Sequence, residues 1–384
     1  MKLVATGDLH LGAGSEYGRQ PGARLEDQRR VWLDICHAAV ESRADAFLFL
    51  GDAFHRRRPS PAELLAFRSG LDVLRQRRIP VVMIAGNHDV AAATAPTPLE
   101  VLAGDGVAMS RRPEILTVAG CQIATLPWTP PAGFLSRSDE DPEQARAQIA
   151  DELLAVARRL RSEIRGPAIL AGHWSVSSAR TPSDVLVDLF REPVLPLDEL
   201  AGVGFEHVLL AHIHKGQVLH EDPYVAYVGS PTITDFGEAD AKHTYLVITD
   251  DTRRFVETTD RAFVTLDYDL DADEQPDVAL YGSTLPRPVQ EAIVRVRITC
   301  ESSQRAGIDV ARLRQRLYDH GAARVAHVSV TVRRSTADAG RLGDVTEQSD
   351  PLDALAHYLT AEGCDEATRE EALSVVGEIL GEAA

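Results

Sequence analysis

Five short apolar runs recur in the first 215 residues, and each ends at a small residue that is followed by polar side chains. The runs cover residues 3–5, 47–50, 81–84, 169–170 and 208–210. Continuous runs of Val, Ile, Leu and Phe are typical of strands that are buried on both faces. These runs therefore predict the central strands of a layered domain.

Helical patterns separate several of these runs. One helix is expected to begin at Ser60, with Pro61 in the first turn and Glu63 completing a capping box. Another is expected over about residues 142–164, where Ile149 and Leu153 share one face with further apolar residues. Strands that alternate with helices predict an α/β fold.

The pattern changes after residues 245–248, which we expect to form the last strand of this domain. The acidic, proline-bearing segment 267–288 is interpreted as a connection and partial insertion. Apolar and polar residues then alternate over 294–298 and again over 326–332, with a helix capped by Asp309 between them. We expect a smaller α+β domain here, and a division of the chain into residues 1–260, 261–340 and 341–384.

The last part of the chain predicts two short helices, one from Asp350 to about Gly363 and one around residues 373–380. Short helices are marginal alone and must dock on something. Their spacing leaves open whether they dock on this chain or on a partner.

The formal net charge of −18 argues against a protein that coats nucleic acid nonspecifically. A local basic groove remains compatible with it, because arginines are bunched at residues 56–58, 75–78 and 158–161. No run approaches the roughly 20 apolar residues that a membrane span requires. We therefore expect a cytoplasmic protein without a membrane segment.

The polar clusters that follow the five runs carry the candidate chemistry. Functional crevices of open α/β sheets lie outside the carboxyl ends of the strands, where all five clusters occur. On extended backbone, residues two apart face the same side, so Asp8 with His10, and His212 with His214, could each present two groups to one site. The predicted ligands are carboxylates, an amide and imidazoles: Asp8, His10, Asp52, Asn87, His173, His212 and His214.

Seven ligands exceed what one ion normally takes, so two divalent ions about 3.5–4 Å apart are expected, with one carboxylate bridging them. The absence of thiolates favours manganese, magnesium, iron or zinc. Such a site retains positive charge and would attract a phosphate diester. We expect His88 to protonate the leaving oxygen, with Asp89 orienting its ring, and His55 as a second candidate at the mouth of the site.

The ordered set from Asp8 to His214 resembles the calcineurin-like metallophosphoesterases. Within that superfamily, residues 51–55 followed by 58–60, and Gly-Asn-His-Asp at 86–89, are similar to the SbcD nucleases and their eukaryotic meiotic-recombination counterpart. Protein phosphatases of the superfamily carry Asp-Arg-Gly after the second motif, which this chain lacks. One departure from the family is Ala211 in place of glycine, which we expect to be tolerated unless the backbone there needs positive φ.

The resemblance implies a layered β-sandwich core flanked by helices, and it implies roles for residues. Asp8, His10, Asp52 and His214 would bind one manganese ion, and Asp52, Asn87, His173 and His212 the other. His88 would assist the leaving group and His55 would position DNA. The second domain resembles a DNA-capping domain, and the tail resembles a helix-loop-helix that binds the coiled coil of an SbcC-like ATPase. DNA ends and a homodimer within a heterotetramer are the other implied partners.

Three functions remain in competition. The first is a Mn-dependent 3′–5′ double-strand exonuclease and single-strand endonuclease of an SbcCD-type complex in DNA repair and recombination. The alternative is a phosphodiesterase for a small nucleotide or other soluble ester, and the third is a binding scaffold with an idle metal site. The additional 130 residues or so after the catalytic domain favour the first, because a small-molecule hydrolase needs no capping domain.

Overall fold

The computed structural model describes residues 1–17, 22–90, 96–130, 141–187, 192–282, 284–333, 351–361 and most of 366–376. The chain divides into two compact units. The first contains Met1–Thr265, Arg287–Arg295 and Leu317–His327, and the second contains Leu266–Pro286, Val296–Arg316 and Val328–Ala384. The boundaries expected at residues 260 and 340 stay predictions, and residues 334–350 lie outside the described part.

Two six-stranded mixed sheets form the first unit. The first sheet has the order β14-β13-β1-β2-β3-β4, in which β1 to β4 are parallel and β13 is antiparallel to β1. Its strands are β1 (Leu3–Thr6), β2 (Ala46–Phe49), β3 (Val81–Ile84), β4 (Val107–Ser110), β13 (Thr244–Ile248) and β14 (Arg253–Glu257). The prediction that residues 245–248 form the last strand is wrong, because β14 pairs with β13 beyond it.

The second sheet has the order β11-β12-β10-β7-β6-β5. Its four central strands are parallel and its two edge strands are antiparallel to their neighbours. The strands are β5 (Glu114–Val118), β6 (Cys121–Leu126), β7 (Ala168–His173), β10 (His207–Ala211), β11 (Gln217–His220) and β12 (Tyr224–Tyr227). All five strands predicted from the apolar runs are present, as β1, β2, β3, β7 and β10.

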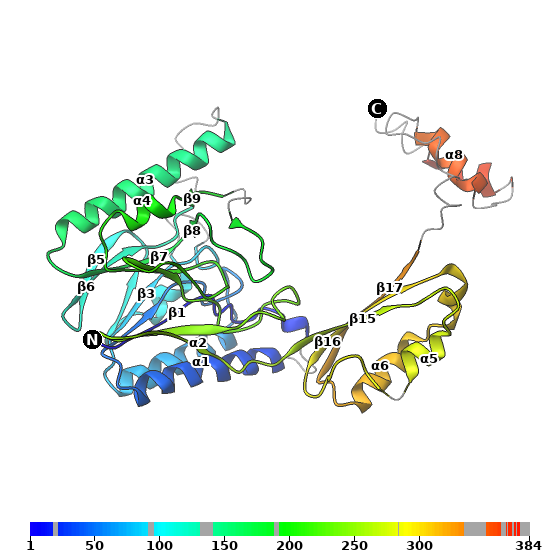
Figure 1. Cartoon of the computed structure of the whole chain (residues 1–384), viewed down its shortest axis with the longest axis horizontal. Helices are drawn as coiled ribbons and strands as arrows, with labels where there is room; N and C mark the ends of the chain where they lie inside the picture. The colour runs from blue at the N-terminus through cyan, green and yellow to red at the C-terminus, as the bar shows by residue number, and fades with distance from the viewer. Residues whose placement is uncertain are drawn as a thin grey trace. The chain divides into compact units, whose positions relative to one another are not determined.

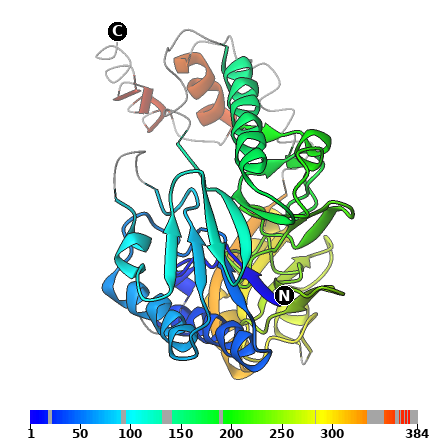
Figure 2. The same ribbon diagram turned by 90° about the vertical axis from the view of Figure 1, so that its left-hand side faces the viewer.

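The two sheets pack face to face and are covered by helices on their outer faces (Figure 1, Figure 2). Residues such as Leu48 and Leu209 fill the layer between the sheets. The helices are α1 (Ala23–Glu41) and α2 (Pro61–Gln76) on the first sheet, and α3 (Pro142–Glu163) and α4 (Leu197–Ala201) on the second. This architecture confirms the predicted α/β layered sandwich.

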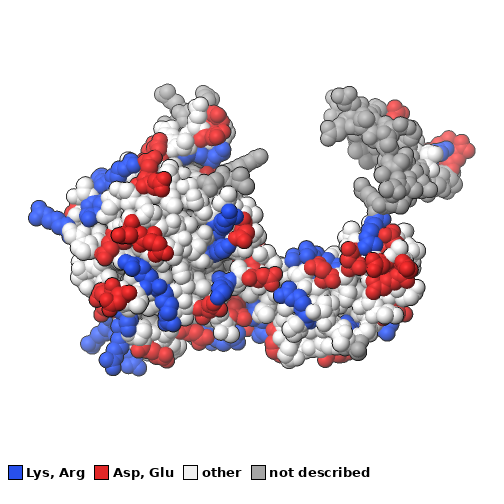
Figure 3. Space-filling view, viewed as in Figure 1, with Lys and Arg blue, Asp and Glu red and all other residues white. Residues whose placement is uncertain are grey.

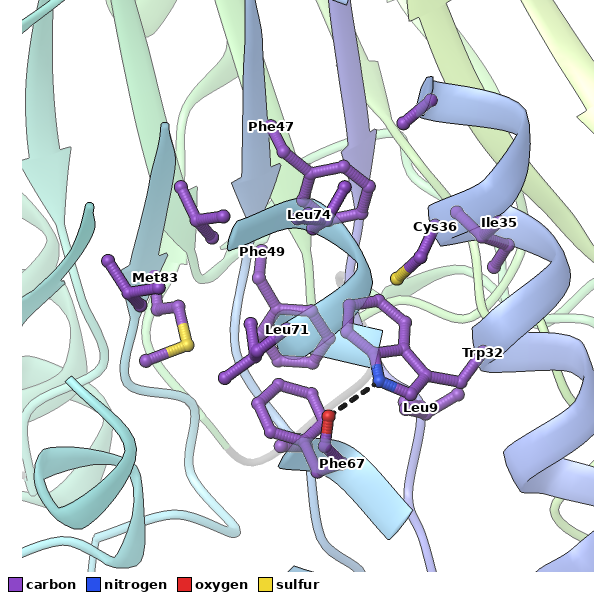
Figure 4. Close-up of a cluster of buried hydrophobic side chains, with 14 of the residues drawn as sticks. Leu9, Trp32, Ile35, Cys36, Phe47, Phe49, Phe67, Leu71, Leu74 and Met83 are labelled. Atoms are coloured by element: carbon purple, nitrogen blue, oxygen red, sulfur yellow. Dashed lines mark hydrogen bonds between the residues drawn. The ribbon is translucent and has the colours of Figure 1, made fainter. Parts of the chain in front are cut away.

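Aromatic packing fixes α1 and α2 on the first sheet (Figure 4). The rings of Trp32 and Phe67 stack with centroids 5.0 Å apart, and the indole N–H of Trp32 donates to the carbonyl of Phe67 at 2.8 Å. The capping box predicted at Ser60 is present, with Glu63 as its partner and proline in the first turn. The local sequence signals at the start of α2 are therefore confirmed.

A three-stranded sheet, β15-β16-β17, follows in the chain. Its elements are β15 (Phe263–Asp269), α5 (Pro276–Tyr281), β16 (Ile293–Cys300), α6 (Val310–Asp319) and β17 (Arg324–Val332). The predicted strand-helix-strand succession is confirmed by β16, α6 and β17. Segment 267–288 is more than the expected connection, since it contains the end of β15 and all of α5.

The remaining elements are short. A two-stranded sheet pairs β8 (Ser175–Val176) with β9 (Val194–Leu195). Helix α8 (Pro351–Ala361) matches the first helix predicted for the tail, and the described residues among 366–376 are helical. Within the described ranges, no helix is both long enough and apolar enough to cross a membrane.

Candidate metal centre

The structure brings all seven predicted ligands to one end of the sandwich. Asp8 and His10 follow β1, Asp52 follows β2, and Asn87 follows β3. His173 ends β7, while His212 and His214 follow β10. Each of these strands is parallel to a neighbour that also carries ligands, so their carboxyl ends meet at the same edge.

Backbone conformation at the site differs from the extended geometry that we expected. Asp8, His10, Asp52 and His212 all have positive φ, at 50°, 45°, 55° and 99°. Such conformations cost roughly 1–3 kcal/mol each and persist only where the surroundings impose them. Backbone hydrogen bonds impose some of them here, because the N–H of Asp8 donates to Gly51 O at 2.9 Å and that of His10 donates to Asp52 O at 3.0 Å. The paired ligands therefore converge through tight turns.

Asp52 lies at the middle of the ligand set. Its Oδ2 is 3.6 Å from Nε2 of His10 and 3.4 Å from Nε2 of His173. Its Oδ1 accepts the backbone N–H of His88 at 2.8 Å. With one buried oxygen between two imidazoles, Asp52 has the position that a bridging ligand needs.

The other ligands approach one another in two groups, and Asp8 lies near both, since it also forms a possible set with Asp52 and His173. In the first group, Nε2 of His10 lies 3.1 Å from Nε2 of His214, and Asp8 completes a set that could hold an ion. In the second, Oδ1 of Asn87 lies 3.0 Å from Nε2 of His173 and 3.0 Å from Nδ1 of His212. Two atoms bound to one ion at about 2.1 Å are themselves about 3.0–3.4 Å apart. The donor atoms therefore fit two metal ions.

Close approach of the backbone explains two glycines of the motifs. A Cβ on Gly86 would lie 2.1 Å from Oδ1 of Asp52. Gly51 has φ 99°, and a Cβ there would lie 2.7 Å from Nδ1 of His173. The backbone at Ala211 does not have positive φ, which meets the condition under which we expect alanine to be tolerated there.

Burial and charge act against each other on the two carboxylates. Burial is the largest influence on Asp8 and raises its pKa above the ordinary value. Burial also acts to raise the pKa of Asp52, but the charges of His173 and His10 outweigh it and the pKa falls below the ordinary range. The lowered pKa keeps Asp52 ionised, which a bridging role would require.

The pKa values of the imidazoles also depend on the balance between burial and neighbouring charge. Burial lowers the pKa of His10 well below its ordinary value. Burial acts in the same direction on His173 and His214, but Asp52 raises the pKa of His173 to about 9, and Glu238 raises that of His214 to about 9. Both rings favour the protonated form because each lies beside a carboxylate. A bound cation would otherwise neutralise that negative charge.

The predicted catalytic residues lie beside the ligands, with one correction. The ring of His88 is perpendicular to that of His10, with ring centroids 4.7 Å apart. The ring centroids of His55 and His88 are 5.5 Å apart. Asp89 does not orient the His88 ring as expected, since Nδ1 of His88 contacts the carbonyl of His55 at 2.7 Å. Oδ2 of Asp89 instead accepts the backbone N–H groups of Asp52 at 2.7 Å and Gly86 at 2.9 Å, and so holds these two turns together.

Two carboxylates at the site were missed by the sequence analysis. Glu238 contacts Nδ1 of His214, and Glu192 contacts Nε2 of His212. Neither directly follows an apolar run that stops at a small residue, which was the signal used to find the candidate ligands. Their positions depend on how loops fold back over the sheet edge, which residue spacing does not reveal.

Comparison with known proteins places this geometry in a family. One component of the SbcCD nuclease of Escherichia coli K12, the SbcD protein, is 26% identical over 267 residues, covering 64% of this chain and 64% of that protein. The Mre11 DNA double-strand break repair protein of Haloferax volcanii is 26% identical over 272 residues, covering 69% of this chain and 54% of its own. This chain thus spans less than two thirds of either relative.

Among solved structures, a dimetal phosphatase from Danio rerio is similar with a TM-score of 0.40 and 12% identity, covering 67% of this chain and 96% of its own. The family model of the calcineurin-like phosphoesterases matches residues 1–216, which is more than half of the 384 residues. The resemblance inferred from the motifs is therefore confirmed, and the chain belongs to the calcineurin-like phosphoesterase family.

Proposed function

We propose that this phosphoesterase is a manganese-dependent DNA nuclease, a 3′–5′ double-strand exonuclease and single-strand endonuclease of an SbcCD-type repair and recombination complex. The observation that carries the proposal is the arrangement of nitrogen and oxygen ligands in two groups around Asp52. The similarity to two proteins named as a nuclease component and a break-repair protein supports DNA as the substrate.

Each group of ligands would hold one ion. Asp8, His10 and His214 with Asp52 would hold the first, and Asn87, His173 and His212 with Asp52 the second. An all-nitrogen-and-oxygen set suits manganese, with magnesium, iron or zinc as alternatives. Bound ions would supply Lewis-acid stabilisation of the phosphoryl oxygens and lower the pKa of a water molecule for attack.

His88 is the proposed proton donor to the leaving oxygen. A carbonyl oxygen only accepts hydrogen bonds, so the contact with His55 O fixes the proton of His88 on Nδ1. Nε2 is then free to face the substrate and, in the charged ring, to deliver a second proton. The His55 side chain is exposed beside it and would position DNA.

Arg56, Arg57 and Arg58 directly follow His55 and are exposed. Members of the other bunches have local partners: Arg75 pairs with Asp72, Arg158 pairs with Glu199, and Arg161 donates to Gly204 O. On the face shown in Figure 3, acidic and basic groups are interspersed on the first unit. We therefore assign the main phosphate contacts to residues 56–58, and we assign DNA capping to the predicted domain 261–340.

The proposed protein partners are an SbcC-like coiled-coil ATPase and a second copy of this chain, together forming a heterotetramer. The name of the E. coli relative, a component of SbcCD, supports the first, and α8 is the proposed docking helix. Exposed Leu65 and Val101, which are 64% and 80% exposed, support the second. They line a hollow of about 330 Å³ beside α2 that a second copy would cover.

The test of the proposed function offers two substrates to the purified protein with manganese. End-labelled duplex DNA and a generic aryl phosphodiester are incubated in parallel, with and without an SbcC-like ATPase. We expect cleavage of DNA that proceeds 3′ to 5′ and is abolished in Asp52→Ala. Cleavage of the small ester alone, even with the ATPase added, would identify a small-molecule phosphodiesterase instead.

A further inference from the structure

The two histidines of the His-x-His pair are held by two different carboxylates on opposite ring nitrogens. Oε1 of Glu238 lies 2.5 Å from Nδ1 of His214. Both carboxylate oxygens of Glu192 lie 3.1 Å from Nε2 of His212. Neither glutamate belongs to the five polar clusters that supply the ligands.

The free nitrogen of each ring faces a different group of ligands. Nε2 of His214 faces Nε2 of His10 at 3.1 Å, whereas Nδ1 of His212 faces Oδ1 of Asn87 at 3.0 Å. A carboxylate accepts but does not donate, so the proton of each neutral ring lies on the side of its glutamate. The lone pair of each ring is thereby turned towards its own group of ligands.

We propose that Glu238 and Glu192 are positioning residues that assign the two histidines to two different ions. Glu238 commits His214 to the ion of Asp8 and His10, and Glu192 commits His212 to the ion of Asn87 and His173. The inference rests on the proposed two-ion site. It adds that each ion depends on its own carboxylate behind one histidine.

Glu238 is the more firmly held of the two. It is 8% exposed, and its Oε2 accepts the backbone N–H of Thr234 at 2.7 Å. Hydrogen bonds to an ionised carboxylate in such a buried setting are stronger than in water. We therefore expect Glu238 to fix the ring of His214 tightly.

Glu192 has a more open environment. Its side chain is 31% exposed and lines a cavity of about 420 Å³ together with His212. The hydroxyl of Ser175 also donates to it, which orients the carboxylate. Because water can replace part of this contact, the effect of removing Glu192 should be the smaller one.

The experiment is a calorimetric manganese titration of the full chain and its variants. We expect wild type to bind two ions, and Glu238→Ala to bind one of them about 10–100-fold more weakly. Glu192→Ala should weaken binding of the other ion by a smaller factor. The glutamine variants of both should recover most of the affinity, because an amide oxygen can still accept the ring N–H.

Double variants identify which ion is affected. If the assignment is right, Glu238→Ala has no further effect in a His10→Ala background but keeps its effect in His173→Ala. Glu192→Ala should show the reverse pattern. Glu199→Ala, which removes a carboxylate paired with the exposed Arg158, is the matched control and should leave both ions unchanged.

The outcomes separate this inference from the proposed function. Wild type that binds two ions while both alanine variants bind them equally well would overturn the inference and leave the function standing. Equal weakening of both ions by either variant would also overturn it, since it would indicate a general structural role. Wild type that binds fewer than two ions at saturation would contradict the proposed site itself.

Discussion

Gly51 lies so close to His173 that a Cβ on the glycine would be 2.7 Å from Nδ1 of the imidazole. That nitrogen contacts the carbonyl of Leu50 at 2.7 Å, so the same turn both orients the ring and leaves no space for a side chain. The turn after β2 thus positions ligands from both sheets.

Gly51→Ala should therefore destabilise the protein by more than the strained backbone conformation alone explains, because the added methyl group would also crowd His173. Gly104 is a matched control, because its φ of 102° is close to the 99° of Gly51 while no atom lies within 4 Å of its Cβ position. Alanine at Gly104 should cost roughly 1–2 kcal/mol of unfolding free energy from strain alone. Gly51→Ala should cost more in urea unfolding and should lose manganese affinity. Equal losses of unfolding free energy in the two variants, with manganese binding intact, would show that crowding against His173 has no effect.

His88→Ala should separate chemistry from metal binding. The ring contacts neighbouring histidines and His55 O but is not needed in either ligand group. Loss of a general acid typically lowers turnover by about 10²–10⁴-fold. We expect a loss of this size in DNA cleavage with both ions still bound, and no change in His220→Ala, whose ring contacts Pro223 O instead. Full turnover in His88→Ala would refute its role as proton donor.

Manganese binding should depend on pH. The pKa values of His173 and His214 are raised to about 9, so both rings carry a second proton near neutral pH. A protonated imidazole has no lone pair for a metal, so binding must release protons. Affinity should therefore rise as the pH increases towards about 9. Calorimetric manganese titrations in two buffers with different heats of ionisation measure the number of protons released. Identical binding heats in the two buffers would show that no proton is released.

Leu65→Asp should prevent self-association without unfolding the chain. The side chain is 64% exposed, so a carboxylate there costs little in the single chain but much in an apolar interface. Sedimentation velocity should show a dimer for wild type and a monomer for the variant. Val278→Asp, at a side chain that is 71% exposed in the second unit, should remain dimeric. A dimer that persists in Leu65→Asp would place the interface elsewhere.

The central strands, and the strand ends that carry the seven candidate ligands, could be predicted from the sequence, because both depend on short-range patterns. The apolar runs before Asp8 and Asp52 are buried β1 and β2, and the capping box at Ser60 begins α2. Segment 267–288 contains the end of β15 and all of α5, and a signal was missed there, because buried Leu266, Tyr268 and Leu270 alternate with exposed Asp267 and Asp269 as in a strand with one buried face.

Backbone details of the site could not be predicted in the same way. Asp8 and His10 converge through left-handed turns, and these are imposed by hydrogen bonds to the turn after β2. The contact of Glu238 with His214 joins two loops, and that of Asp89 with Asp52 joins two turns at different strand ends. Such contacts depend on the folded arrangement, which spacing along the chain does not encode.

Asp52 is proposed to bridge two ions, and anomalous diffraction from crystals grown with manganese can locate both of them. We expect two anomalous peaks about 3.5–4 Å apart. One should lie beside His10 and His214 and the other beside Asn87 and His173, with the Asp52 carboxylate between them. A single peak at saturating manganese, or two peaks that do not share Asp52, would contradict this bridging role.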